Sequence, residues 1–88
     1  MLLLPATLVH NTATASLADL LRALHAEPSA SVAVDASALV RFDSTALAVL
    51  LELRRVALQL GKTLALQAVP PRLTDLARVY GIVELLPA

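Results

Sequence analysis

The sequence predicts a single α/β domain over residues 1–88, with a largely parallel four-stranded sheet and about three to four helices. Short extended segments alternate with amphipathic helical segments along the whole chain. This alternation implies crossover connections between parallel strands. A length of 88 residues allows one modest hydrophobic core and no second domain.

The first third of the chain predicts short extended segments followed by a helix. Residues 2–4 and 7–9 are apolar and flank Pro5, which lacks an N–H donor and therefore favours a strand end or a sheet edge. Asn11 and Thr12 offer capping oxygens for a helix over residues 13–26. The apolar stripe of this helix comprises Leu17, Leu20, Leu21 and Leu24.

The middle of the chain predicts a buried strand and a long helix. Residues 31–35 carry β-branched side chains at alternate positions between polar segments, which is typical of a strand. A helix is expected from Ser44 to about residue 60, with Gly61 at its end. Its core stripe comprises Ala46, Leu50, Leu53, Ala57 and Leu60.

The last third predicts another strand, a helix and a final extended segment. Residues 63–69 alternate as a strand does, and Pro70-Pro71 favours a helix start, with Gly81 at the helix end. We expect residues 82–86 to form the fourth strand or an extended tail. The side chains expected to face inward from the helix are Leu73, Leu76, Ala77 and Tyr80.

Composition excludes several classes of protein. The net charge is zero and aromatic residues make up 2%, so neither a basic surface nor stacking platforms for nucleic acid are expected. The longest apolar run, from Ala46 to Leu51, is far shorter than the ~20 residues of a membrane span, so no direct membrane insertion is expected. Residues 41–78 hold six basic and three acidic residues, which suggests a surface that faces a partner.

The residues that catalysis or cofactor binding would require are few. His10 and His25 lack the spacing of metal ligands, and there is no cysteine. The two glycines, Gly61 and Gly81, stand at expected helix ends rather than in a phosphate-binding loop. We therefore expect no catalytic site, no metal, no cofactor and no enzymatic activity.

One polar segment, Asp43-Ser44-Thr45, stands at the start of the long helix. In one interpretation these side chains cap the helix and complement its dipole. In the other, an exposed hydroxyl at a helix start is a regulatory phosphorylation site, because free backbone amides there can hold the added phosphate. The residues alone leave both interpretations open.

A second apolar stripe runs beside the core stripe of the long helix. It comprises Leu47, Leu51, Arg54 and Leu58. A domain this small cannot bury every leucine of one helix, so the stripe is a candidate partner interface, with Arg54, Arg55 and Arg78 as a polar rim. The alternative is that Leu47 and Leu51 complete a wide core face.

The chain resembles a STAS domain, the fold named for sulfate transporters and anti-sigma factor antagonists. The resemblance rests on Val34-Asp35, which ends a strand, and on Phe42-Asp43-Ser44-Thr45-Ala46-Leu47, which opens a helix. Ala46 stands where the family usually has glycine. The stretches Leu66-Gln67-Ala68-Val69 and Leu76-Ala77-Arg78-Val79-Tyr80-Gly81 resemble the small STAS subunit of Mla-type phospholipid ABC transporters.

The resemblance implies a non-catalytic subunit that docks on an ABC ATPase, in a complex with permease and lipid-binding subunits. It also implies a cytoplasmic location, peripheral at the inner membrane through that partner. Ser44 falls at the phosphoacceptor position of anti-sigma factor antagonists, and in the family this hydroxyl position lies in the partner interface. A phosphorylation-controlled anti-sigma factor antagonist is therefore the alternative function.

Overall fold

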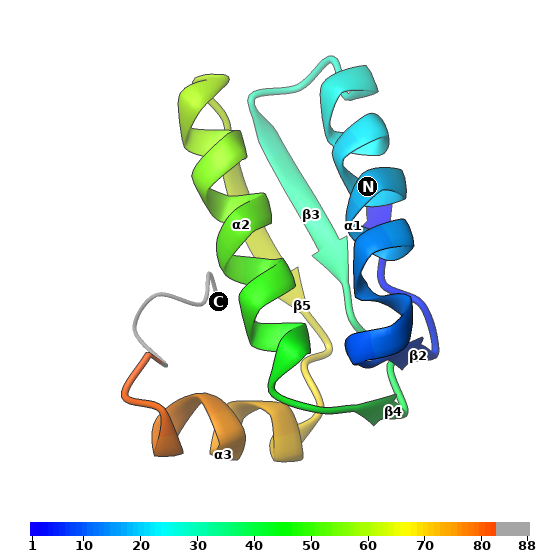
Figure 1. Ribbon diagram of the computed structural model, residues 1–88. Helices are drawn as coiled ribbons and strands as arrows, with labels where there is room; N and C mark the ends of the chain where they lie inside the picture. The colour runs from blue at the N-terminus through cyan, green and yellow to red at the C-terminus, as the bar shows by residue number, and fades with distance from the viewer. Residues whose placement is uncertain (83–88) are drawn as a thin grey trace.

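The computed structural model describes residues 1–82 and shows a small parallel sheet packed against helices (Figure 1). The elements are β1 (Leu2–Leu3), β2 (Thr7–Leu8), α1 (His10–Ala26), β3 (Ser31–Asp35), β4 (Arg41–Phe42), α2 (Thr45–Gln59), β5 (Thr63–Gln67) and α3 (Pro71–Val79). Strands β1, β3 and β5 form a parallel sheet in that order, and β2 pairs with β4 in a separate parallel ribbon. The predicted α/β class with a parallel sheet is confirmed.

The central strand β3 fixes the register of the sheet. Its Val34 lies opposite Leu2 of β1 and Leu66 of β5. Val32 and Val34 are buried, whereas Ser31 is exposed, because successive side chains of a strand point to opposite faces. The apolar side of all three strands therefore contributes to one core.

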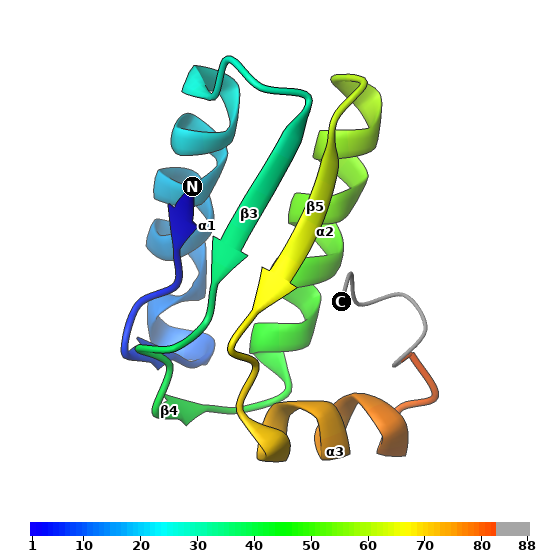
Figure 2. The same cartoon turned by 180° about the vertical axis from the view of Figure 1, so that it is seen from behind.

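Helices α1 and α2 cover the same face of this sheet. Figure 1 shows both helices in front of the strands, and Figure 2 shows the strands in front of both helices. Leu20 and Leu24 of α1 and Leu50 and Leu53 of α2 are buried in the core. Helix α3 lies across the end of the sheet to which β3 and β5 point (Figure 2).

Helices α2 and α3 end in the same way. Gly61 and Gly81 both adopt φ of +71°, a left-handed conformation that glycine adopts without steric cost. After α2, the Lys62 N–H donates to the Ala57 carbonyl at 2.8 Å, and after α3 the Ile82 N–H donates to the Ala77 carbonyl at 2.9 Å. This is the Schellman arrangement, which satisfies carbonyls at a helix end. Both glycines were predicted as helix ends from the sequence.

Some predicted elements need correction. Within residues 1–82 the main sheet has three strands rather than four, and the expected strand over residues 82–86 lies almost wholly outside the described residues. Strand β4 was not expected. Helix α1 begins at His10 rather than at residue 13, so Thr12 lies inside the helix, where its hydroxyl accepts the Val9 N–H at 3.1 Å.

Two side chains that were expected to face the core are exposed. Leu60 and Tyr80 follow the last residues of α2 and α3 as their C-cap residues. The chain turns away from the helical path at these positions, so the apolar stripe no longer extends over the sheet. Tyr80 is 58% exposed and is therefore a surface residue rather than part of the core.

The helices of this domain are short compared with the thickness of a lipid bilayer or carry charged side chains. None of those in residues 1–82 has both the length and the apolar character that crossing a membrane requires.

Candidate functional site

Asp43 holds the start of α2 through its side chain and its backbone carbonyl. The Thr45 N–H donates to Oδ1 of Asp43 at 2.9 Å, and the Ala46 N–H donates to the Asp43 carbonyl at 3.0 Å. The His10 N–H, at the start of α1, donates to Oδ2 of Asp43 at 3.3 Å. One carboxylate therefore ties the first turns of both helices together.

These hydrogen bonds favour the ionised form of Asp43. The side chain and the backbone N–H of Thr45 lower the pKa of Asp43 below its ordinary value, and the nearby His10 lowers it further. An ionised carboxylate accepts these N–H bonds more strongly than a neutral carboxyl group does, so ionisation and capping support each other. The capping interpretation is confirmed for Asp43.

Ser44 behaves differently from Asp43. It is exposed, has helical backbone angles, and makes no side-chain capping hydrogen bond. The neighbouring amides of Thr45, Ala46 and Leu47 already donate to Asp43 or to the Ser44 carbonyl. The amides of Thr45, Ala46 and Leu47 are therefore not free to hold a phosphate, whereas the Ser44 side chain makes no capping bond and the residue is exposed.

Asp35, the other aspartate of the motif, serves the loop after β3. The Ser37 N–H donates to its Oδ1 at 2.8 Å, and the bonds from the amide and the side chain of Ser37 lower the pKa of Asp35. The Asp35 carbonyl accepts the Leu4 N–H at 2.9 Å, which links this loop to β1. Asp35 therefore orders the loop that follows β3 and ties it to the chain after β1.

A shallow groove of about 490 Å³ opens beside Ser44, between the start of α2 and α3. We call it the α2–α3 groove. Its lining residues are Phe42, Asp43, Ser44, Arg72, Asp75, Leu76, Val79 and Tyr80. Leu73 and Ala77 of α3 are buried in the core, and Leu76 of the groove is partly buried against the same core, so one helix contributes to both the core and the groove.

The sequence interpretation missed most of this groove. The guanidinium of Arg72 lies over the ring of Phe42, 5.0 Å from its centroid, and Val79 is 82% exposed. The spacing of Arg72, Asp75, Leu76 and Val79 is that of one helix face, which was visible in the sequence. The sequence did not show that this face lies next to Phe42 and Ser44.

The structure divides the predicted stripe on α2. Leu47 is only 3% exposed and belongs to the core, so its expected place on an exposed flank is wrong. It lies at the end of α2 that packs near α3, whereas the other end of α2 extends away from α3 (Figure 1). Leu51 and Arg54 are half-buried, and Leu58 is 53% exposed. Leu58 alone has the exposure expected of an apolar docking residue.

The predicted arginine rim is also divided. Arg55 makes two bonds to Glu52, with Nε–Oε1 at 2.8 Å and Nη2–Oε2 at 2.6 Å, and Arg78 pairs with Asp75 at 3.2 Å. The two bonds between Arg55 and Glu52 lower the pKa of Glu52 and raise the pKa of Arg55. Arg54 and Arg72 make no ion pair with any carboxylate of residues 1–82.

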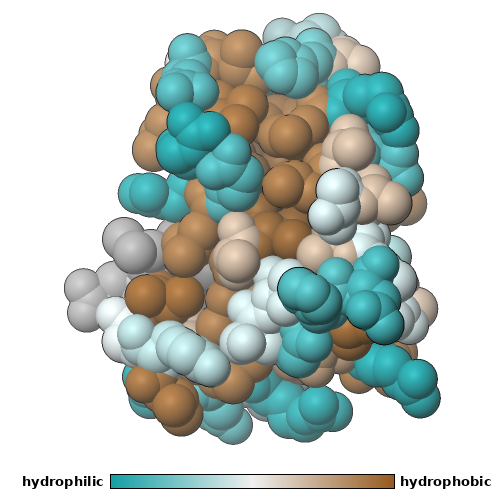
Figure 3. Space-filling view, in the orientation of Figure 1, coloured by the Kyte–Doolittle hydropathy of each residue, from teal (hydrophilic) through white to brown (hydrophobic). Residues whose placement is uncertain are grey.

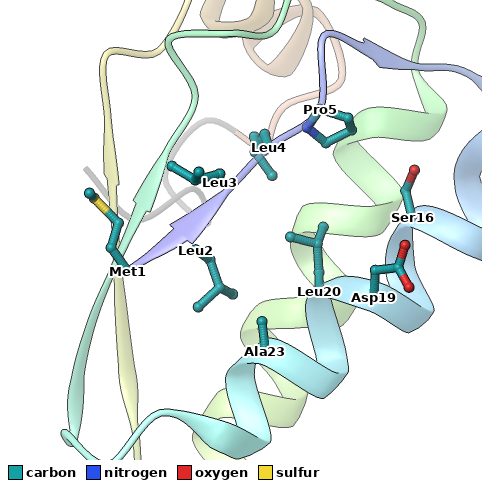
Figure 4. A pocket seen from close by; sticks show the side chains of 9 residues that line it. All are labelled: Met1, Leu2, Leu3, Leu4, Pro5, Ser16, Asp19, Leu20 and Ala23. Atoms are coloured by element: carbon teal, nitrogen blue, oxygen red, sulfur yellow. The ribbon is translucent and has the colours of Figure 1, made fainter.

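Two further hollows lie outside this site. One of about 460 Å³, which we call the β1–α1 hollow, lies between the side chains of β1 and α1, where Leu20 faces Leu2 (Figure 4). The other is smaller and opens between α1 and α2, in the apolar band that separates their hydrophilic surfaces (Figure 3). No cluster of three or more metal-ligating side chains occurs among the residues that the structure describes.

The comparison with protein families agrees with this geometry. The family model described as "Mlab, STAS domain" matches residues 6–87, nearly the whole chain. The protein belongs to this STAS family. A comparison with curated proteins found no match. The predicted STAS domain of the MlaB type is thereby confirmed, and Asp43-Ser44-Thr45 and the α2–α3 groove become the candidate site of a STAS domain.

Proposed function

We propose that this protein is a non-catalytic STAS subunit that docks on the ATPase of a phospholipid ABC transporter and supports its assembly or activity. One observation carries the proposal beyond family membership. The Ser44 hydroxyl is exposed and makes no capping bond, and it borders a groove with exposed apolar walls. A surface of this kind is typical of a binding site for another protein.

The partner defines the rest of the proposal. The ATPase is expected in a complex with permease and lipid-binding subunits, which places the STAS domain in the cytoplasm at the inner membrane. Residues 41–78 carry a net charge of +3, and part of this charge, Arg54 and Arg72, makes no ion pair with a described carboxylate. In this proposal the domain contacts protein rather than nucleic acid or lipid.

Co-purification tests the proposal directly. The tagged full chain, expressed in its native host, is expected to retain an ABC ATPase together with its permease, and to change the ATP hydrolysis rate of the purified ATPase. Capture of a serine kinase together with a sigma factor, with no ATPase, would overturn the proposal.

A pair of matched variants tests the α2 flank of the interface. Leu58→Asp and Leu3→Asp each place a charge at an exposed leucine, 53% and 66% exposed respectively, on different elements of the domain. Leu58→Asp is expected to weaken ATPase binding about 10-fold or more, and Leu3→Asp to leave it unchanged. If both variants bind the ATPase equally well, Leu58 is not part of the interface and the α2–α3 groove is the docking surface that remains.

The second candidate is an anti-sigma factor antagonist regulated through Ser44. The accessible Ser44 hydroxyl favours it, although the amides around Ser44 are already occupied. Intact-mass measurement of protein from the native host is expected to show one phosphate per chain in this case, and none in Ser44→Ala. An unmodified mass under all growth conditions would reject this candidate.

A further inference from the structure

The α2–α3 groove contains one positively charged side chain, Arg72, that makes no ion pair with a described carboxylate. The Asp43 oxygens accept backbone amides of His10 and Thr45, and Asp75 is paired with Arg78. Arg72 lies within 4 Å of no carboxylate of residues 1–82. The guanidinium of Arg72 is therefore available to form an ion pair with a carboxylate of a partner.

The guanidinium of Arg72 is also held in place before any partner arrives. Its stacking over Phe42, with 5.0 Å between Cζ and the ring centroid, restricts a side chain that is otherwise flexible. A guanidinium that lies over an aromatic ring still has N–H groups along its edge, and these match the two oxygens of a carboxylate. Because the side chain is already ordered, less entropy is lost when a carboxylate binds.

Large apolar side chains are exposed in the walls of the groove. Val79 is 82% exposed and Tyr80 is 58% exposed, and both line the groove together with Leu76. A small inorganic anion would leave these side chains in water. A segment that carries a carboxylate between apolar side chains would neutralise Arg72 and cover Val79 and Tyr80 together.

We infer that the α2–α3 groove binds a protein segment of the partner in which a Glu or Asp side chain is flanked by apolar residues, and that Arg72 selects the acidic side chain. The inference relies on the proposed function for the identity of the partner, the transporter ATPase. A phosphorylated lipid surface fits less well, because Arg78 is already paired with Asp75 and Arg72 is the one free cation among the described lining residues.

Binding of the purified ATPase to the full chain tests this role of Arg72. Arg72→Gln keeps an unbranched polar side chain but removes the charge and the guanidinium over Phe42, and it is expected to weaken binding about 30-fold. Arg72→Lys is expected to weaken it by less, because a lysine supplies the charge without the paired donors. Arg22→Gln is the matched control, since Arg22 is exposed on α1 and pairs with Asp19, and its binding should remain at the wild-type level.

The salt dependence and a charge reversal give independent readouts. Affinity of the wild type is expected to fall between 50 and about 300 mM NaCl more steeply than that of Arg72→Gln, because the ion pair is screened. Arg72→Glu is expected to regain binding to an ATPase in which the matching acidic residue is changed to Arg. If Arg72→Gln and Arg22→Gln bind equally well while Leu58→Asp does not bind, the inference is overturned and the proposed docking stands.

A peptide probe separates this inference from the proposed function. The probe is an acetylated and amidated pentapeptide with Glu between two Leu residues, compared with the same peptide carrying Gln. The Glu peptide in the millimolar range is expected to shift the amide NMR signals of Ser44, Val79 and Tyr80 in the wild type only. Equal shifts by both peptides, or a response to inorganic phosphate or to phosphatidylglycerol vesicles alone, would overturn the assignment even if no ATPase binds.

Discussion

The α2–α3 groove and the β1–α1 hollow enclose similar volumes, about 490 and 460 Å³, but their walls have different chemistry. The hollow is floored by Leu2, Leu4 and Leu20, which belong to the core, and its Asp19 is paired with Arg22. The groove has a Ser44 hydroxyl without a capping bond and a cation, Arg72, without a described carboxylate.

This difference shows that the size of a depression does not identify a site in so small a domain. At the β1–α1 hollow, the core reaches the surface beside the edge strand β1 (Figure 4). At the groove, Ser44 and Arg72 are exposed to solvent and make no capping bond or ion pair with the described residues, so they contribute little to folding. Substitutions in the hollow should therefore affect stability, and substitutions in the groove should affect binding.

The largest expected effect is the loss of stability on changing the floor of the hollow. Leu20 is buried, so Leu20→Ala removes apolar contacts and leaves a cavity, and it is expected to lower the free energy of unfolding by about 2–5 kcal/mol. Urea unfolding measures this change. Binding of the folded fraction to the partner should remain as in the wild type. A cost below about 1 kcal/mol would show that the hollow is not part of the core.

A substitution in the wall of the groove is expected to weaken partner binding and to leave stability nearly unchanged. Val79→Ser removes exposed apolar surface without adding charge, so the free energy of unfolding should change by no more than about 0.5 kcal/mol. Partner affinity should fall about 10-fold, since a valine buried on docking contributes roughly 1.5–3 kcal/mol. Leu3→Ser in the hollow is the matched control. If Leu3→Ser lowered partner affinity more than Val79→Ser, the hollow rather than the groove would be the binding site.

The fold was predictable from the sequence where the apolar periodicity and the residues that start and end an element indicate the same bounds. The bounds of β3 match the prediction, and those of α2 differ by a residue at each end, because their apolar periodicity is flanked by clear start and stop residues. Strand β4 was not predictable, since its two residues form a strand only by pairing with Thr7 and Leu8, far away in the sequence.

The site was predictable only in part, for a similar reason. Asp43 and Ser44 stand in a motif with its own local structure, and the sequence identified them. Arg72 and Val79 lie on the polar side of α3, and only the placement of α3 across the end of the sheet brings that side to Phe42. The pairing of Arg55 and Arg78 could have been anticipated, because Glu52 and Asp75 each precede them by three residues.

The smallest expected effect concerns the one carboxylate of the groove that does serve the fold. Asp43→Asn keeps an oxygen acceptor for the start of α2 but removes the charge. The pKa of Asp43 is lowered in the folded domain, so its charge stabilises the fold above its ordinary pKa of 3.8, and this contribution is lost as the pH falls through the lower folded value. The urea midpoint of Asp43→Asn should therefore lie below that of the wild type at pH 7, and the two should converge at acidic pH. A difference that stays constant between pH 7 and the acid transition would mean that the Asp43 charge has no part in holding α1 and α2 together. Ser44→Ala, one residue further along, is the control for this profile and should follow the wild type at every pH, because Ser44 makes no capping bond.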